Sequence, residues 1–102
     1  MNVSPAAQEI YTQATVQAEL ESLTATLAEH AHSQGIATKS FDLRFDVMGS
    51  ALILDQQVDA DADAALDYWG SLEDDLARFH ASLPTTQDMR AISEMYIIVS
   101  WH

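Results

Sequence analysis

The chain has 102 residues, and its sixteen acids against four Lys and Arg give a formal net charge of −12 at pH 7. The length suits one domain with a modest core, the hydrophobic fraction of 48% argues against disorder, and the lack of cysteine excludes disulfides and thiolate chemistry. Because so negative a field repels nucleic acid and anionic membranes, we predict a single domain over residues 1–102 whose partner is a basic protein, with no direct nucleic-acid or membrane contact.

The N-terminus carries no basic stretch followed by an apolar run, and no apolar run in the chain is long enough to span a membrane. The sequence therefore predicts a cytoplasmic protein without a signal peptide.

A long helix is expected from Ser4 to just before Gly35. The Ser4 hydroxyl is suited to cap a free amide at a helix start, and Pro5 is tolerated at the first helical position. Apolar residues then recur at three and four residues, which predicts one stripe packed on the core, with Ile10 near its edge. This stripe comprises Val16, Leu20, Leu23, Leu27 and Ala31.

A second line of small residues falls on another side of the same predicted helix. Small side chains let a second helix approach closely, so this line is a candidate self-association surface for a homodimer. It comprises Ala7, Ala14, Ala18 and Ala25, with Tyr11 beside it. The alternative is that alanine is simply the best helix former and is tolerated in water.

From Phe41 the apolar period changes to two, which predicts a strand with one wet face, followed by a turn at Gly49 and Ser50 and a second strand. A two-residue loop at that turn sets the register of the hairpin. It places Val47 opposite Leu52, Phe45 opposite Leu54, and Arg44 opposite Asp55.

Helical spacing returns from about Asp61 to Leu83, where Pro84 ends it. The apolar face of this second helix comprises Ala65, Trp69, Leu72, Leu76, Phe79 and Leu83. The opposite, solvent-facing side comprises Asp63, Asp67, Ser71, Asp74 and Arg78, with Asp74 placed to pair with Arg78.

The segment Met95 to Trp101 is almost continuously β-prone and predicts a last strand. The fold class is therefore α+β, a two-layer α-β-β-α-β domain with a three-stranded mixed sheet and two helices on one face. We expect the third strand to run parallel to the second. It can lie beside the first strand or beside the second, and we favour the first; its nearly continuous apolar run also fits a central strand. The other sheet face would leave an apolar patch that suits an interface: Met48, Ile53, Tyr96 and Ile98.

No motif in the sequence carries a recognisable chemistry. The spacing of Asp59, Asp61 and Asp63 imitates half a calcium loop, but Ala64 and Gly70 stand where that loop needs its Gly and its Glu, so these acids are interpreted as the start of the second helix. His30 and His32 are two residues apart on a helix, so their side chains point away from each other. Two histidines that bind one zinc ion must converge, and this pair is therefore not a predicted zinc site. The acids and base on the outer sheet face are interpreted as an ion network: Asp42, Arg44, Asp46 and Asp55. We therefore predict no catalytic residue, no metal, no cofactor and no enzymatic activity.

Half of the acids lie between Asp55 and Asp75, a stretch without Lys or Arg. Carboxylates on a rigid helix can replace phosphates opposite basic side chains. The sequence thus favours an acidic protein-interaction domain, an inhibitor that occupies the basic, nucleic-acid-binding cleft of a larger protein such as a nucleic-acid-binding enzyme. Its surface is analogous to those of nucleic-acid mimics, immunity proteins and anti-CRISPR or anti-restriction proteins. The expected contacts are Asp63, Asp67, Glu73, Asp74 and Asp75.

The alternative is a self-assembling structural or chaperone-like module. In that interpretation the alanine line or the outer sheet patch makes the contact, and the acidic surface serves solubility only.

Self-repulsion among so many acids predicts that the fold gains stability as salt is added. Raising NaCl from about 10 mM to about 500 mM should raise the melting temperature by roughly 5 °C, because the screening length falls from about 30 Å to a few Å. Circular dichroism melts across this range measure the effect. A melting temperature that stays constant or falls would contradict it.

Overall fold

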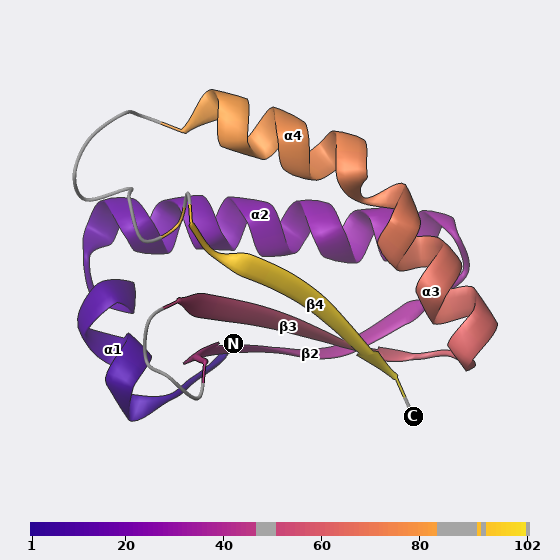
Figure 1. The fold of residues 1–102 in the computed structure, drawn as a ribbon, viewed down its shortest axis with the longest axis horizontal. Coiled ribbons are helices and arrows are strands. Elements are labelled where there is room, and N and C mark those ends of the chain that lie inside the picture. The colour runs from indigo at the N-terminus through magenta and orange to yellow at the C-terminus, as the bar shows by residue number, and fades with distance from the viewer. Residues whose placement is uncertain (47–50, 84–91, 93, 102) are drawn as a thin grey trace.

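The computed structural model describes residues 1–46, 51–83, 92 and 94–101, and Figure 1 shows its two layers. The strands are β1 (Asn2–Val3), β2 (Ala37–Phe45), β3 (Leu52–Asp59) and β4 (Tyr96–Trp101). The helices are α1 (Pro5–Tyr11), α2 (Ala14–Ser33), α3 (Ala62–Ser71) and α4 (Glu73–Ser82). The predicted α+β class is confirmed, but the prediction of three strands and two helices was incomplete.

The first predicted helix is broken after Tyr11. Gln13 has an extended backbone with φ −70° and ψ 123°, so the chain turns between α1 and α2. The turn lets Ala7 of α1 and the predicted stripe of α2 enter the same core, and every member of that stripe is buried. Ser4 has the extended backbone of a helix cap, but its hydroxyl makes no capping bond.

The sheet has a strand that the sequence did not predict. Asn2 and Val3 pair in parallel with Asp42 and Leu43, and the Ser4 amide donates to the Leu43 carbonyl at 2.9 Å. The strand order is β1-β2-β3-β4, so β1 and β4 are the outer strands of the four described.

The predicted hairpin register was wrong by two residues. Phe45 lies opposite Leu52, Arg44 opposite Ile53, and the Asp46 amide donates to the Ala51 carbonyl at 2.9 Å. Val47, Met48, Gly49 and Ser50 lie outside the described residues. A shift of two residues keeps every side chain on its face, so the apolar pattern alone did not distinguish the two registers.

The last strand runs parallel to β3, as predicted, but the expectation that it lies beside β2 was wrong. Leu54 pairs with Ile97 and Gln56 with Val99, which makes β4 an edge strand rather than a central one. Helices α3 and α4 carry the chain from the end of β3 back to the start of β4 (Figure 1).

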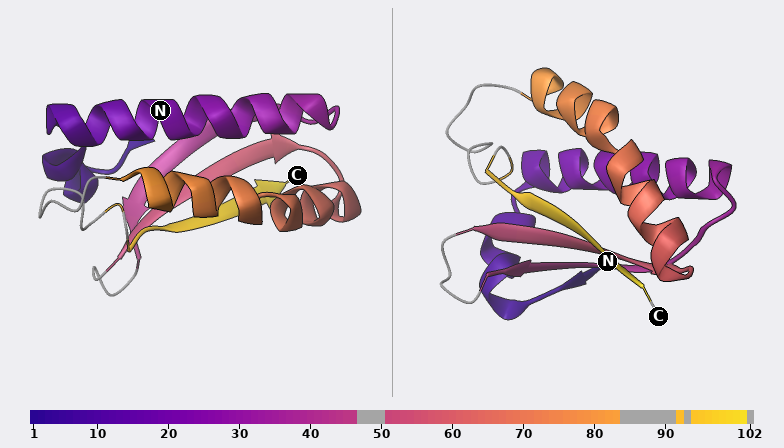
Figure 2. Two further views of the ribbon diagram at one scale, coloured as in Figure 1. Left: turned by 90° about the horizontal axis from the view of Figure 1, so that it is seen from above. Right: turned by 45° about the vertical axis from the view of Figure 1, so that its right-hand side comes forward.

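The second predicted helix is two helices that meet at Leu72. Asp61 caps α3 by accepting a hydrogen bond from the Ala64 amide at 2.8 Å, which confirms that this acid starts the helix rather than half of a calcium loop. Figure 2 shows α2 and α4 on the same side of the sheet, with α4 continuing from α3 at an angle. Leu43, Leu54 and Val99 of the sheet are buried beneath this helical layer.

A buried polar cluster joins the two layers. The Tyr68 hydroxyl lies 2.9 Å from the Leu27 carbonyl and 2.6 Å from Gln56 Oε1, and donates its single proton to one of these oxygens at a time. Gln56 Nε2 donates to the Thr38 hydroxyl at 3.0 Å. Tyr68 and Gln56 are fully buried, so the cluster holds α2, α3, β2 and β3 in one arrangement.

Tyr68→Phe should cost about 1 to 2 kcal/mol because it leaves the buried Gln56 amide short of a partner. It should also change the response to alkali. Burial raises the pKa of Tyr68 from 10.0 to about 12. The unfolded chain therefore loses this proton first, and the stability that the neutral hydroxyl contributes below pH 10 is lost as the pH rises toward 12.

Urea unfolding from pH 8 to pH 11 measures this effect, with Tyr96→Phe as the control because Tyr96 is 63% exposed. The Tyr68→Phe variant should lose less stability than the wild type between pH 10 and 11. Equal losses in both proteins would contradict the role of Tyr68.

Candidate functional site

The outer side of α3 and α4 presents a row of exposed carboxylates. Asp63 and Asp67 lie one helical turn apart on α3, and Glu73 and Asp74 open α4. All four are exposed, and none makes an ion pair with another described residue. Four of the five predicted partner contacts are therefore exposed on these two helices and free of ion pairs to other described residues.

An apolar groove lies beside this row. It is lined by Leu66, Trp69, Gly70, Glu73 and Leu76 and encloses about 410 Å³. Leu66 is 51% exposed although it is a large apolar side chain. Gly70 has open space where a side chain would lie, so it leaves the floor of the groove accessible between Leu66 and Glu73. Trp69 and Leu76 were predicted to lie on the core face; they pack against the core and also border this groove.

Asp75, the fifth predicted contact, has a different role. Its side chain is only 12% exposed, and its carboxylate accepts from His30 Nδ1 at 2.5 Å and pairs with Arg78. The prediction that Arg78 pairs with Asp74 was wrong, because Arg78 pairs with Asp75 instead. The hydrogen bond from His30, with a further contribution from Arg78, lowers the pKa of Asp75 below its usual 3.8.

His30 connects three helices. Besides Asp75 of α4, it meets Ser71 at the end of α3, whose Oγ lies 3.0 Å from His30 Nε2. Gln34, which follows α2, places its Nε2 at 2.9 Å from His30 Nε2 and 2.8 Å from Ser71 Oγ. Ser71 Oγ also donates to the Tyr68 carbonyl at 2.6 Å. No local sequence pattern indicates this cluster, because its members are brought together only by helix packing.

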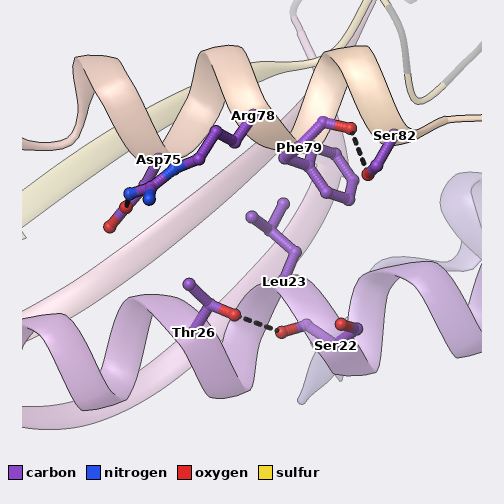
Figure 3. A pocket seen from close by; sticks show the side chains of 7 residues that line it. All are labelled: Ser22, Leu23, Thr26, Asp75, Arg78, Phe79 and Ser82. Atoms are coloured by element: carbon purple, nitrogen blue, oxygen red, sulfur yellow. Dashed lines mark hydrogen bonds and ion pairs between the residues drawn. The ribbon is translucent and has the colours of Figure 1, made fainter.

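A second groove lies between α2 and α4, and Figure 3 shows it from close by. It encloses about 430 Å³. Leu23 of α2 and Phe79 of α4 point toward each other across it, and Asp75 and Arg78 lie at one side (Figure 3). The remaining lining residues are Ser22, Thr26 and Ser82.

The outer sheet face carries one ion pair of the predicted network. Arg44 Nη1 donates to Asp55 at 3.1 Å, and the Ser100 hydroxyl donates to the same carboxylate at 2.8 Å. Asp42 accepts from the Gln57 amide instead of pairing with Arg44. Next to this network Tyr96 is 63% exposed. Ile53 and Ile98 are half-buried there, as the sequence predicted.

The predicted alanine line is divided between two helices. Ala7 is fully buried in the core and Tyr11 packs against it, so both belong to the interior of this chain. Ala14, Ala18 and Ala25 are exposed on α2. Only the α2 part of the line is open to a second copy.

Histidines outside the cluster have ordinary surroundings where they are described. His32 and His80 are exposed, and His102 lies outside the described residues. Within the described part of the chain, no three His, Cys, Asp or Glu side chains are grouped to hold a metal ion. No helix among those residues is long and apolar enough to cross a membrane.

Comparison with known proteins adds no relative: no family model, no curated protein and no solved structure matches the chain. The proposed function is therefore based on the surfaces of the chain itself: the α3–α4 surface, the groove between α2 and α4, and the outer sheet face.

Asp75→Asn should destabilise the fold by about 1 kcal/mol at pH 7, the value of a hydrogen-bonded charge partly screened by water. Because the pKa of Asp75 is lowered in the folded state, its contribution is present above pH 3.8 and is lost as the pH falls through the folded-state pKa. The difference between variant and wild type should therefore shrink in acid.

Asp74→Asn is the matched control, since Asp74 is the exposed neighbour and should be close to neutral. Thermal melts at pH 7 and pH 3 measure both variants. An equal effect of the two substitutions at pH 7 would show that the His30 contact contributes nothing.

Proposed function

We propose that this chain is an acidic protein-interaction domain whose α3–α4 surface binds a basic segment of a larger protein. The observation that carries the proposal is the apolar groove at Leu66 and Gly70 beside a row of unpaired carboxylates. A partner that matches this surface has an apolar anchor with Lys or Arg next to it.

The two parts of the surface have different roles in binding. An apolar anchor that fills the groove supplies affinity, because it removes Leu66 and the edge of Trp69 from water. Asp63, Asp67 and Asp74 speed association and select a basic partner. Their lack of ion pairs to other described residues means that no internal contact must be broken before they bind.

The helices that carry the surface are held in place. Tyr68 fixes α3 to Leu27 of α2, and Asp75 fixes α4 to His30 of the same helix. Rigid elements lose little conformational entropy on binding, which favours affinity. Their exposed carboxylates, carried on helices that are held in place, support the finer proposal of an inhibitor that imitates a phosphate backbone and occupies a nucleic-acid-binding cleft.

The test uses a synthetic helical peptide with Lys and Arg on one face and Leu and Trp on the other, titrated by calorimetry at low salt. Replacing Asp63, Asp67 and Asp74 with Asn should weaken binding about tenfold or more, and Leu66→Ser should weaken it at all salt concentrations. The matched control replaces Glu9, Glu21 and Glu29 with Gln, which removes the same charge from exposed positions on α1 and α2.

Equal loss of binding in the triple-Asn and triple-Gln variants would show that only the total charge matters and would contradict a defined site. The inhibitor proposal needs a further result: a basic protein captured from an extract counts only if this chain and duplex nucleic acid compete for it.

The second candidate function is the self-assembling or chaperone-like module. The exposed Tyr96 beside Ile53 and Ile98 on the open sheet face supports it. A homodimer through this face should be visible by light scattering at micromolar concentration and should dissociate in Tyr96→Glu, whereas Ala18→Glu tests the α2 alternative. A monomer throughout that range removes this candidate.

A further inference from the structure

We propose that Ser71, His30 and Asp75 form a nucleophile, a general base and an orienting acid that hydrolyse small carboxylic esters. Ser71 Oγ lies 3.0 Å from His30 Nε2, and His30 Nδ1 lies 2.5 Å from Asp75 Oδ2. A serine, a histidine and an aspartate joined in this order are recognised as a triad by their geometry and not by their order in the chain.

The contacts of His30 are compatible with the tautomer that a base needs. Gln34 Nε2 lies 2.9 Å from His30 Nε2, and an amide N–H donated there requires a lone pair on this nitrogen. The ring proton is then on Nδ1 and is donated to Asp75. In this state Nε2 can accept a proton from Ser71, and Asp75 stabilises the imidazolium that forms.

Ser71 is held in a resting position from which it reaches the base by rotation. Its hydroxyl donates to the Tyr68 carbonyl at 2.6 Å. When the Ser71 O–H bond turns toward His30, the hydroxyl donates to the lone pair on His30 Nε2. It takes the place of the Gln34 N–H that donates there in the resting position. Gln34 Nε2 remains 2.8 Å from Ser71 Oγ, so the released N–H can donate to an oxyanion that develops beside this oxygen.

The acylation step balances with these groups alone. Ser71 Oγ bonds to the ester carbonyl carbon, its proton passes to His30 Nε2, and the carbonyl π electrons move to the oxygen. The oxyanion then collapses, the bond to the alcohol oxygen breaks, and the alcohol leaves with the proton from Nε2. Water repeats the sequence on the acyl-serine, giving the acid and restoring the Ser71 hydroxyl.

Neither Ser71 nor His30 lines the groove between α2 and α4, which meets the cluster only at Asp75 (Figure 3). A small ester therefore reaches Ser71 Oγ from solvent and not through that groove. Ser71 is exposed, so water reaches the acyl-serine directly.

The experiment is active-site labelling of the full-length chain with a fluorophosphonate probe, mapped by peptide mass spectrometry, together with hydrolysis of 4-nitrophenyl butyrate. The wild type should be labelled at Ser71, and labelling should remove the esterase activity. Ser71→Ala and His30→Gln should each lower both rates about 100-fold, the usual contribution of a positioned base.

Ser33→Ala is the matched control. Ser33 ends α2 as Ser71 ends α3 and donates to a backbone carbonyl three residues back, at 2.6 Å, but its hydroxyl meets no imidazole nitrogen. This variant should keep full labelling and activity. A wild-type chain that takes no label at Ser71, or takes as much in His30→Gln, overturns the proposal, and the wild-type result stands even if a variant fails to fold.

Discussion

The burial of two polar side chains is the constraint on which the arrangement of helices over the sheet depends. Tyr68 and Gln56 are fully buried, and without partners each would cost a few kcal/mol. They find partners only when α3 lies against both α2 and β3, with the Tyr68 hydroxyl at the Leu27 carbonyl. Once Tyr68 points inward, Leu66 and Gly70 must point outward and Ser71 comes within reach of His30. One buried cluster therefore positions both the proposed docking groove and the proposed catalytic cluster.

Features that depend on one element could be predicted from the sequence, and features that depend on packing could not. The stripe from Val16 to Ala31 and the outward direction of Asp63, Asp67 and Asp74 follow from helical periodicity alone. The helix break at Gln13 has no glycine or proline beside it, and β1 has only two residues, so neither has a local signal. The break at Leu72 has one, because Gly70 stands two residues before it. His30 and Asp75 are 45 residues apart and meet only because α2 and α4 lie side by side. The solvent-facing side was thus predictable, whereas the His30 cluster was not.

The acids divide into two groups with different physical roles. Asp55 and Asp75 are largely buried, accept hydrogen bonds and belong to the structure. The other group is exposed, makes no ion pair with other described residues, and adds to the self-repulsion of a chain with net charge −12. It comprises Asp63, Asp67, Glu73 and Asp74. Acids that serve solubility alone need no particular position, yet Glu73 lines an apolar groove, and Asp67 and Asp74 directly follow its lining residues Leu66 and Glu73 in the chain. This placement is what favours binding over solubility as their role.

The most direct test of the docking surface is a nitrogen-15 NMR titration of the chain with the basic amphipathic peptide. The account predicts that amide shifts change mainly from Asp61 to Leu76, with the largest changes near Leu66 and Gly70, and that β4 remains unaffected. Changes centred on Tyr96 and Ile98, or small changes spread over every acidic residue, would contradict it. The first of these results would favour the open sheet face as the interface, and the second would favour a role in solubility only.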